Sequence, residues 1–120
     1  MDIQRIGLRP EKSPLYNKAV IYGGIAHLAG QVAVNPLPTA GEQTRQILAQ
    51  IDDYLAQCGT DKSRLLTATV LFADMRDYEE VNAVWDVWVV PGAIPTRTAF
   101  QAKLVTPRNL VAIQVSAALP

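Results

Sequence analysis

The sequence predicts an α+β fold, a two-layer sandwich in which two helices cover one face of a mixed β-sheet. Two segments, 40–58 and 78–89, carry apolar residues at helical spacing and so present one apolar stripe each. The other apolar segments are short and rich in β-branched residues, which is typical of strands. A helix buries its apolar stripe against another element, so helices and sheet are expected to form one domain over residues 1–120.

The first strands are expected before residue 35. Residues 2–7 are predicted to form a short strand, and residues 18–23 and 25–34 to form a hairpin that turns at Gly23 and Gly24. Gly30 interrupts the second strand of this hairpin. A glycine inside a strand indicates a bulge or a close approach of the backbone to another group.

Both helices have a recognisable start. Thr39 and Glu42 have the spacing of a capping box, and Asp77 and Glu80 repeat it before the second helix. The residues of the two apolar stripes are Ile47, Leu48, Ile51, Leu55 and Cys58 in the first helix, and Val81, Val84, Trp85 and Trp88 in the second.

The strand expected at 65–73 is apolar on both sides. Alternation places on one side Leu66, Ala68, Val70 and Phe72, and on the other Leu65, Thr67, Thr69 and Leu71. A strand of this kind is buried on both faces. Because two helices cover only one face of the sheet, we expect other subunits to cover the second face.

The last two predicted strands, 96–104 and 110–119, each contain one polar exception. Arg97 lies at the start of a nearly uncharged strand, and Gln114 points away from the row of Val and Ile side chains in the other. Arginine offers a planar fork that fits a carboxylate, and glutamine can hold a water or a polar group without acting as a strong base. Residue types alone favour structural roles, in which Arg97 pairs with an acid at a subunit interface and Gln114 caps a neighbouring backbone group.

Composition disfavours several other classes of function. The 11 basic and 11 acidic residues give a net charge of zero, and no basic stripe suggests a nucleic-acid partner. No apolar run is long enough to span a membrane, and the charged N-terminus does not read as a secretory signal, so a cytoplasmic location is expected. His27 and Cys58 stand alone of their kinds, so neither a metal site nor an internal disulfide is expected.

Four stretches of the chain resemble the RidA (YjgF) family of reactive intermediate deaminases, and within it the YoaB-like branch. They are "IAHLAGQVAVNP", "AGEQTRQILAQIDDYLAQCGTDKSRLLTATVLFADMRDYEEVNAVWDVWV", "IPTRTAFQAKL" and "VAIQVSAAL". These stretches cover nearly the whole chain in order. The Gly-Gln pair, the Asp-Met-x-Asp-Tyr segment that ends in Val-Asn, and Pro-x-Arg are together fairly specific.

The resemblance implies a chorismate-mutase-like fold that assembles as a homotrimer with clefts between subunits. It also implies hydrolysis of 2-imino and enamine acids, such as 2-aminoacrylate, to 2-keto acids and ammonia, without a cofactor. In the same comparison Arg97 matches the arginine that grips the substrate carboxylate. Tyr16 and Asn82 match residues that line the cleft, and Gly30 lies where the backbone approaches the ligand.

Three positions depart from the family pattern. Gln114 stands where the best-known members have a glutamate that is thought to hold the attacking water, Ala29 replaces a serine, and Ala99 replaces a cysteine. A protonated imine is a strong electrophile that needs a positioned water more than a strong base, so catalysis is expected to survive. The alternatives are a protein that binds 2-keto acids without catalysis and a deaminase specialised for a catabolic pathway. The neutral net charge disfavours a ribonuclease.

Overall fold

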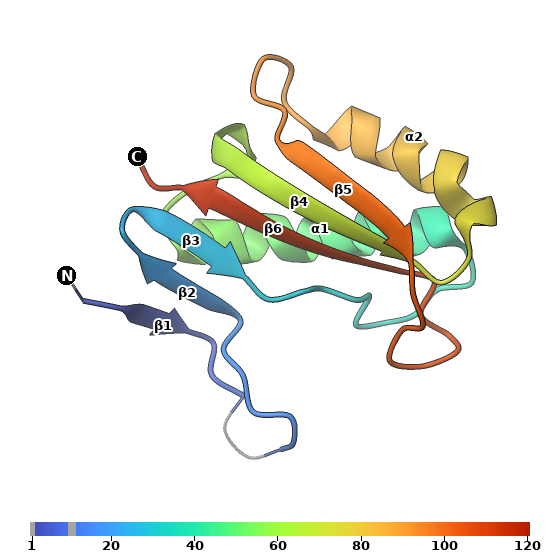
Figure 1. Cartoon of the computed structure of the whole chain (residues 1–120), viewed down its shortest axis with the longest axis horizontal. Coiled ribbons are helices and arrows are strands. Elements are labelled where there is room, and N and C mark those ends of the chain that lie inside the picture. Colours follow the sequence, from blue (N-terminus) through green and yellow to red (C-terminus); the bar gives the residue numbers. More distant parts are fainter. Residues whose placement is uncertain (1, 10–11) are drawn as a thin grey trace.

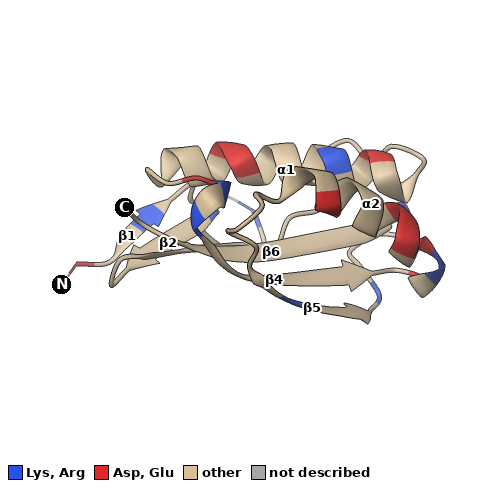
Figure 2. Ribbon diagram, turned by 90° about the horizontal axis from the view of Figure 1, so that it is seen from above, with Lys and Arg blue, Asp and Glu red and all other residues tan. Residues whose placement is uncertain are grey.

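The computed structural model describes residues 2–9 and 12–120, which form a six-stranded mixed sheet with two helices on one face (Figures 1 and 2). The strand order is β1-β2-β3-β6-β4-β5; only β4 and β5 pair in parallel, and α2 connects them. This confirms the predicted α+β two-layer architecture. The elements are β1 (Gln4–Ile6), β2 (Ala19–Tyr22), β3 (Ile25–Leu28), α1 (Ala40–Gln57), β4 (Leu65–Phe72), α2 (Tyr78–Trp88), β5 (Thr96–Gln101) and β6 (Val111–Ala118).

The hydrophobic core fills the space between the helices and the sheet. Each predicted helical stripe faces this core: Ile47, Ile51 and Leu55 of α1 are completely buried, as is Val81 of α2. Alternate residues of β6 face the same way. Its inward row is Val111, Ile113, Val115 and Ala117.

The predicted hairpin forms, but its second strand is shorter than expected. Gly23 and Gly24 both have positive φ (62° and 77°), as a two-residue turn with φ > 0 at both central positions requires. The strand predicted to reach residue 34 ends at Leu28. Beyond it the backbone turns towards α1, where Gln50 accepts from Val34 N–H at 3.1 Å and Gln46 accepts from Asn35 N–H at 2.6 Å.

A bulge in β4 corrects the predicted faces of its first residues. Between Leu65 and Thr67 the register with β6 shifts by one residue, so Leu65 is buried at 7% exposure and Leu66 is 39% exposed. Strict alternation predicted the opposite placement of these two leucines. From Ala68 onwards the predicted alternation holds.

Two other predicted features differ in the structure. The strand expected at 96–104 ends at Gln101, because its partner strand β4 ends opposite at Phe72. Asp77 makes no side-chain capping bond to α2, while Glu80 accepts from the backbone N–H of Gly41 at the start of α1. Glu80 therefore ties the two helices together instead of completing a capping box. At the first helix, Thr39 accepts from Glu42 N–H as expected.

Candidate functional site

Arg97 is the single Lys, Arg, Asp or Glu in the five strands β2 to β6. It lies on β5, which is the edge strand of the sheet, and its ladder partner is Ala68. Ala68 is buried beneath the helices, so Arg97 also points to the helix-covered face. In Figure 2 the strands are tan except for β1 and a blue segment near the start of β5.

The guanidinium of Arg97 is held by three residues of α2. Its Nη2 donates to Asn82 Oδ1 at 2.6 Å, and its Cζ lies 5.3 Å from the Trp85 ring centroid and 5.8 Å from that of Tyr78. Aromatic faces attract a cation at these distances. Among residues 2–9 and 12–120 no carboxylate lies within ion-pair distance of Arg97. Most of its five N–H donors therefore remain available for an anionic ligand.

Sequence reasoning missed the two aromatic partners of Arg97. Trp85 had been assigned to the apolar stripe alone, and Tyr78 had not been singled out. The signal was present, because residues at positions i−4, i and i+3 share one helix face and Asn82 lies between Tyr78 and Trp85 at these spacings.

Gln114 lies on the other face of the sheet. Its ladder partner Thr69 and its exposed side chain both face away from the helices. Its Nε2 donates to the backbone oxygen of Leu28 at 3.3 Å, which leaves Oε1 available to accept a hydrogen bond. Within one chain, Arg97 and Gln114 therefore do not converge.

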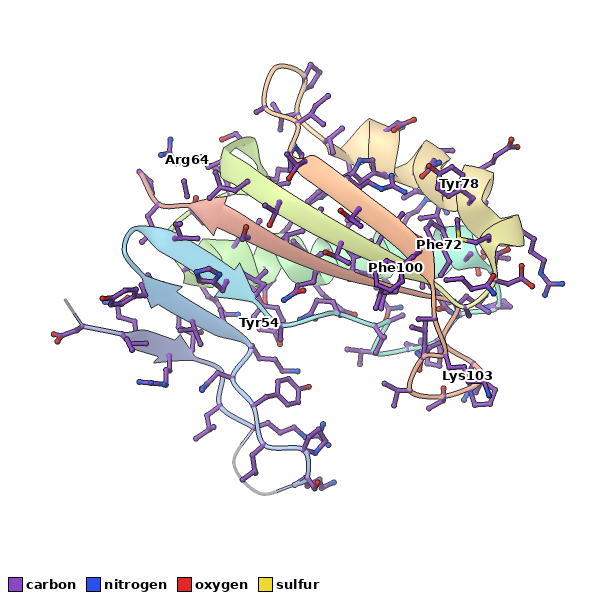
Figure 3. All side chains as sticks on the ribbon, in the orientation of Figure 1. Tyr54, Arg64, Phe72, Tyr78, Phe100 and Lys103 are labelled. Carbon is purple, nitrogen blue, oxygen red and sulfur yellow. The ribbon has the colours of Figure 1, made fainter. Side chains whose placement is uncertain are left out.

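Tyr16 and Gly30 line one pocket of about 460 Å³ at the end of β3. Lys18 also lines it and donates from Nζ to Tyr16 Oη at 3.2 Å. This hydrogen bond is the main cause that lowers the pKa of Tyr16, because a positive neighbour stabilises the phenolate; burial opposes the effect. Figure 3 labels Tyr54, which lines this pocket, and Tyr78 of α2, whose ring lies near the Arg97 guanidinium.

No feature of the chain itself requires glycine at position 30. A Cβ built on Gly30 meets no atom within 4 Å, and its φ is not positive. Neither packing nor backbone conformation therefore excludes a side chain.

The candidate residues thus form two separate groups. Arg97 and Asn82 lie at the β5 edge, whereas Tyr16 and Gly30 line the pocket at the end of β3. Gln114 does not line that pocket and lies on the open face of β6. In the sheet, β5 is three strand positions from β3, which corresponds to about 14 Å at the usual strand spacing. One protomer does not bring the two groups together.

A larger hollow of about 760 Å³ lies between α1 and α2 and contains none of the candidate residues. Both acids that line it are hydrogen-bonded within the chain: Asp52 accepts from Trp88 Nε1, and Glu80 accepts from Gly41 N–H. We therefore assign this groove to helix packing.

In the described part of the chain, no three His, Cys, Asp or Glu residues are grouped so that they could hold a metal ion. Cys58 is buried, and burial raises the pKa of its thiol, so it has no feature of a nucleophile. Of the helices described, none is long and apolar enough to cross a membrane.

The sequence matches the family described as endoribonuclease L-PSP over residues 7–119. Among curated proteins, the chain is 47% identical to a RutC family protein of Haemophilus ducreyi over 87% of this chain and 89% of that protein. It is 38% identical to the RutC family protein YoaB of Escherichia coli strain K12, over 93% and 97% of the two chains. It is 30% identical to the mouse 2-iminobutanoate/2-iminopropanoate deaminase, over 85% and 79%.

Solved structures share the fold. A YjgF family protein of Neisseria meningitidis superposes with a TM-score of 0.93 at 42% sequence identity, covering 100% of this chain and 97% of that one. Similarity of this degree extends over all the elements described above.

Proposed function

The chain belongs to the RidA (YjgF) family, and from this membership and the geometry around Arg97 we propose that it hydrolyses small 2-imino acids to 2-keto acids and ammonia. Membership and the mouse relative support imine deamination in general. The proposed substrate, a small 2-imino acid, and the proposed roles of single residues are argued from the site residues described above.

The environment of Arg97 carries this proposal. A half-buried guanidinium without a carboxylate partner in the described part of the chain is costly unless a ligand completes it. Asn82, Tyr78 and Trp85 fix its orientation and leave its donors open. A bidentate pair with the α-carboxylate of an imino acid fits this arrangement and contributes about 1.5–3 kcal/mol.

Gln114 is proposed to position the attacking water through Oε1. The water oxygen bonds to the imine carbon while the C=N π electrons move to nitrogen, which is already protonated. The adduct first carries the added water as an oxonium, and one of its protons moves from oxygen to nitrogen. The C–N bond then breaks with its electron pair leaving on nitrogen, and the remaining O–H proton passes to the departing ammonia, which gives the keto acid and ammonium. The electrophile is a protonated imine, so a positioned water can attack it without a strong base. A general base would add a further factor of roughly 10²–10⁴ to the rate.

We propose that the two groups meet between copies of the chain in a homotrimer. The open face of the sheet supports this, because β2 to β6 carry no Lys, Arg, Asp or Glu there and expose Tyr22 and Phe100 by 50% and 51%. An uncharged face of this kind is suited to burial against another subunit. Arg97 and Asn82 of one copy would then face Tyr16 and Gly30 of the next.

The test is hydrolysis of 2-iminobutanoate generated in situ by an amino-acid oxidase and followed by semicarbazide trapping. Arg97→Ala is expected to lower kcat/KM roughly 10- to 100-fold, since the lost pair with the substrate carboxylate is worth about 1.5–3 kcal/mol. Arg97→Lys keeps the positive charge but lacks the planar guanidinium, so its rate should lie between those of the wild type and Arg97→Ala. Arg76→Ala, which removes an exposed arginine near α2, is the matched control. A wild-type rate equal to that without protein would exclude the proposal.

Because Gln114 stands where the best-known family members have a glutamate, a second candidate function is binding of 2-keto acids without turnover. Calorimetry with 2-oxobutanoate combined with the imine assay separates the two functions. Binding without acceleration selects the binding protein. Gln114→Glu then adds a base and is expected to raise the rate about 10-fold or more if the site is catalytic.

A further inference from the structure

We propose that the pocket beside Tyr16 binds the second carboxylate of a dicarboxylic 2-imino acid, with Lys18 and Arg108 as its cations. This inference rests on the proposed function, in which Arg97 of a neighbouring copy holds the α-carboxylate. It deepens that function by naming the substrate class: imines of acidic amino acids with a side chain that ends in a carboxylate.

The charge of the pocket lining is the first observation. Lys18 and Arg108 line the pocket, and none of the residues that line it is Asp or Glu. In the described part of the chain neither cation has a carboxylate within ion-pair distance. This contrasts with the chain as a whole, in which acids and bases are equal in number. A pocket with two cations and no acid in its lining favours an anionic ligand.

Lys18 is partly buried, and its ammonium group is held in position at the pocket. Its Nζ donates to Tyr16 Oη at 3.2 Å and lies 5.0 Å from the Tyr16 ring centroid and 6.0 Å from that of Tyr54. The two aromatic rings limit the positions that the ammonium can take. One of its three N–H groups is used by Tyr16, so two remain for a ligand. The lowered pKa of Tyr16 reports the same positive environment.

Arg108 provides the second cation from a fixed backbone at the rim. The buried Gln43 donates from Nε2 to Arg108 O at 2.9 Å, while the Arg108 side chain is exposed. The pocket volume of about 460 Å³ lies within the usual range for small-molecule sites, so a five-carbon dicarboxylate fits with room for water. Gly30 lines the same pocket, where a ligand can approach its bare backbone.

The binding test compares two keto acids of equal chain length, 2-oxoglutarate and 2-oxopentanoate, which differ in a terminal carboxylate against a methyl group. We expect calorimetry on the assembled protein to give about 10-fold tighter binding of 2-oxoglutarate, the worth of one charge-assisted contact. Lys18→Met keeps the aliphatic stem and should remove this preference, and Lys18→Arg should keep it. Lys62→Met makes the same change beside Trp88, away from the pocket, and should keep the preference. Circular dichroism checks that each variant folds.

The turnover test uses the imines of glutamate and norvaline. A binding preference that depends on Lys18, with neither imine hydrolysed, would support the pocket and reject the proposed function. Hydrolysis of both imines at equal rates, with equal binding of both keto acids, would reject the pocket and leave the proposed function in place. Equal displacement of 2-oxoglutarate by inorganic phosphate at the same concentration would also overturn the dicarboxylate assignment, because it would reduce the site to a general anion site.

Discussion

Polar side chains on the two faces of the sheet have different surroundings. On the helix-covered face, Arg97 is held by Asn82 and two aromatic rings, all from α2 of the same chain. On the open face, Gln114 has one hydrogen bond to a backbone oxygen. Its neighbours are small or apolar side chains that no element of residues 2–9 and 12–120 covers. The helices cover one face of the sheet, whereas the described part of the chain leaves the other face open.

The largest effect on assembly and activity is expected from a charge placed on the open face. Leu71→Glu would bury an unpaired carboxylate if copies pack there, at a cost of several kcal/mol. We expect a shift to monomers in light scattering and a loss of activity of roughly 100-fold or more.

Val87→Glu is the matched control for this prediction, because Val87 lies on α2 and is 86% exposed. It should change neither mass nor rate. A Leu71→Glu protein that keeps the mass and the rate of the wild type would contradict the packing of open faces.

A smaller effect is expected from a charge on the helix-covered side. Asn82→Asp places a carboxylate 2.6 Å from the Arg97 guanidinium, where it would compete with the substrate carboxylate. We expect KM to rise roughly 10-fold or more, since the pair that must be displaced is worth about 1.5–3 kcal/mol.

Asn82→Ala separates this competition from a loss of positioning. It removes the bond to Arg97 without adding a charge, so its KM should lie between those of the wild type and Asn82→Asp. If Asn82→Asp has the lower KM of the two variants, Arg97 does not hold the substrate carboxylate.

The smallest effect is expected at Gly30, which lines the pocket beside Tyr16. Gly30→Ala should leave the free energy of unfolding within about 0.5 kcal/mol of wild type, because its Cβ meets nothing in the protomer. Activity should fall by roughly 10-fold, less than the 10² that a misplacement of ~1 Å can cost.

Gly24→Ala gives the opposite pattern and serves as the control. Its Cβ also meets nothing, but its φ of 77° costs an alanine about 1–2 kcal/mol, so stability falls and activity per folded molecule is kept. Unfolding in urea and the imine assay, run on both variants, decide between these outcomes. Unchanged activity in Gly30→Ala would remove the case for a ligand at this backbone.

Much of the fold could be predicted because periodicity is local. The two helical stripes, the Gly23–Gly24 turn and the inward row of β6 all follow from spacing within one segment. The errors arose where a distant partner decides. β5 ends where β4 ends, and the β4 bulge exchanges Leu65 and Leu66 between faces.

The candidate site divides in the same way. Arg97 was recognisable from the sequence as the charge at the start of a nearly uncharged strand. The resemblance of the chain to the RidA family suggested its role as the residue that binds the substrate carboxylate. The rings that hold it lie on a helix 12 to 19 residues earlier in the chain, and no local pattern shows which strand that helix face contacts. Lys18 was not singled out, because a lysine at the start of a strand is ordinary until Tyr16, Tyr54 and Arg108 are seen around it.

By itself, the sequence determined which segments are helix and strand, that one side of the sheet lacks charge, and that Arg97 is an exception. These properties depend on residue types and spacing along the chain. Only the tertiary structure decided that Arg97 and Gln114 lie on opposite faces and that a pocket lined by Lys18 and Arg108 lies beside Tyr16. Strand order and register fix those relations, and they arise from pairing between segments far apart in the sequence.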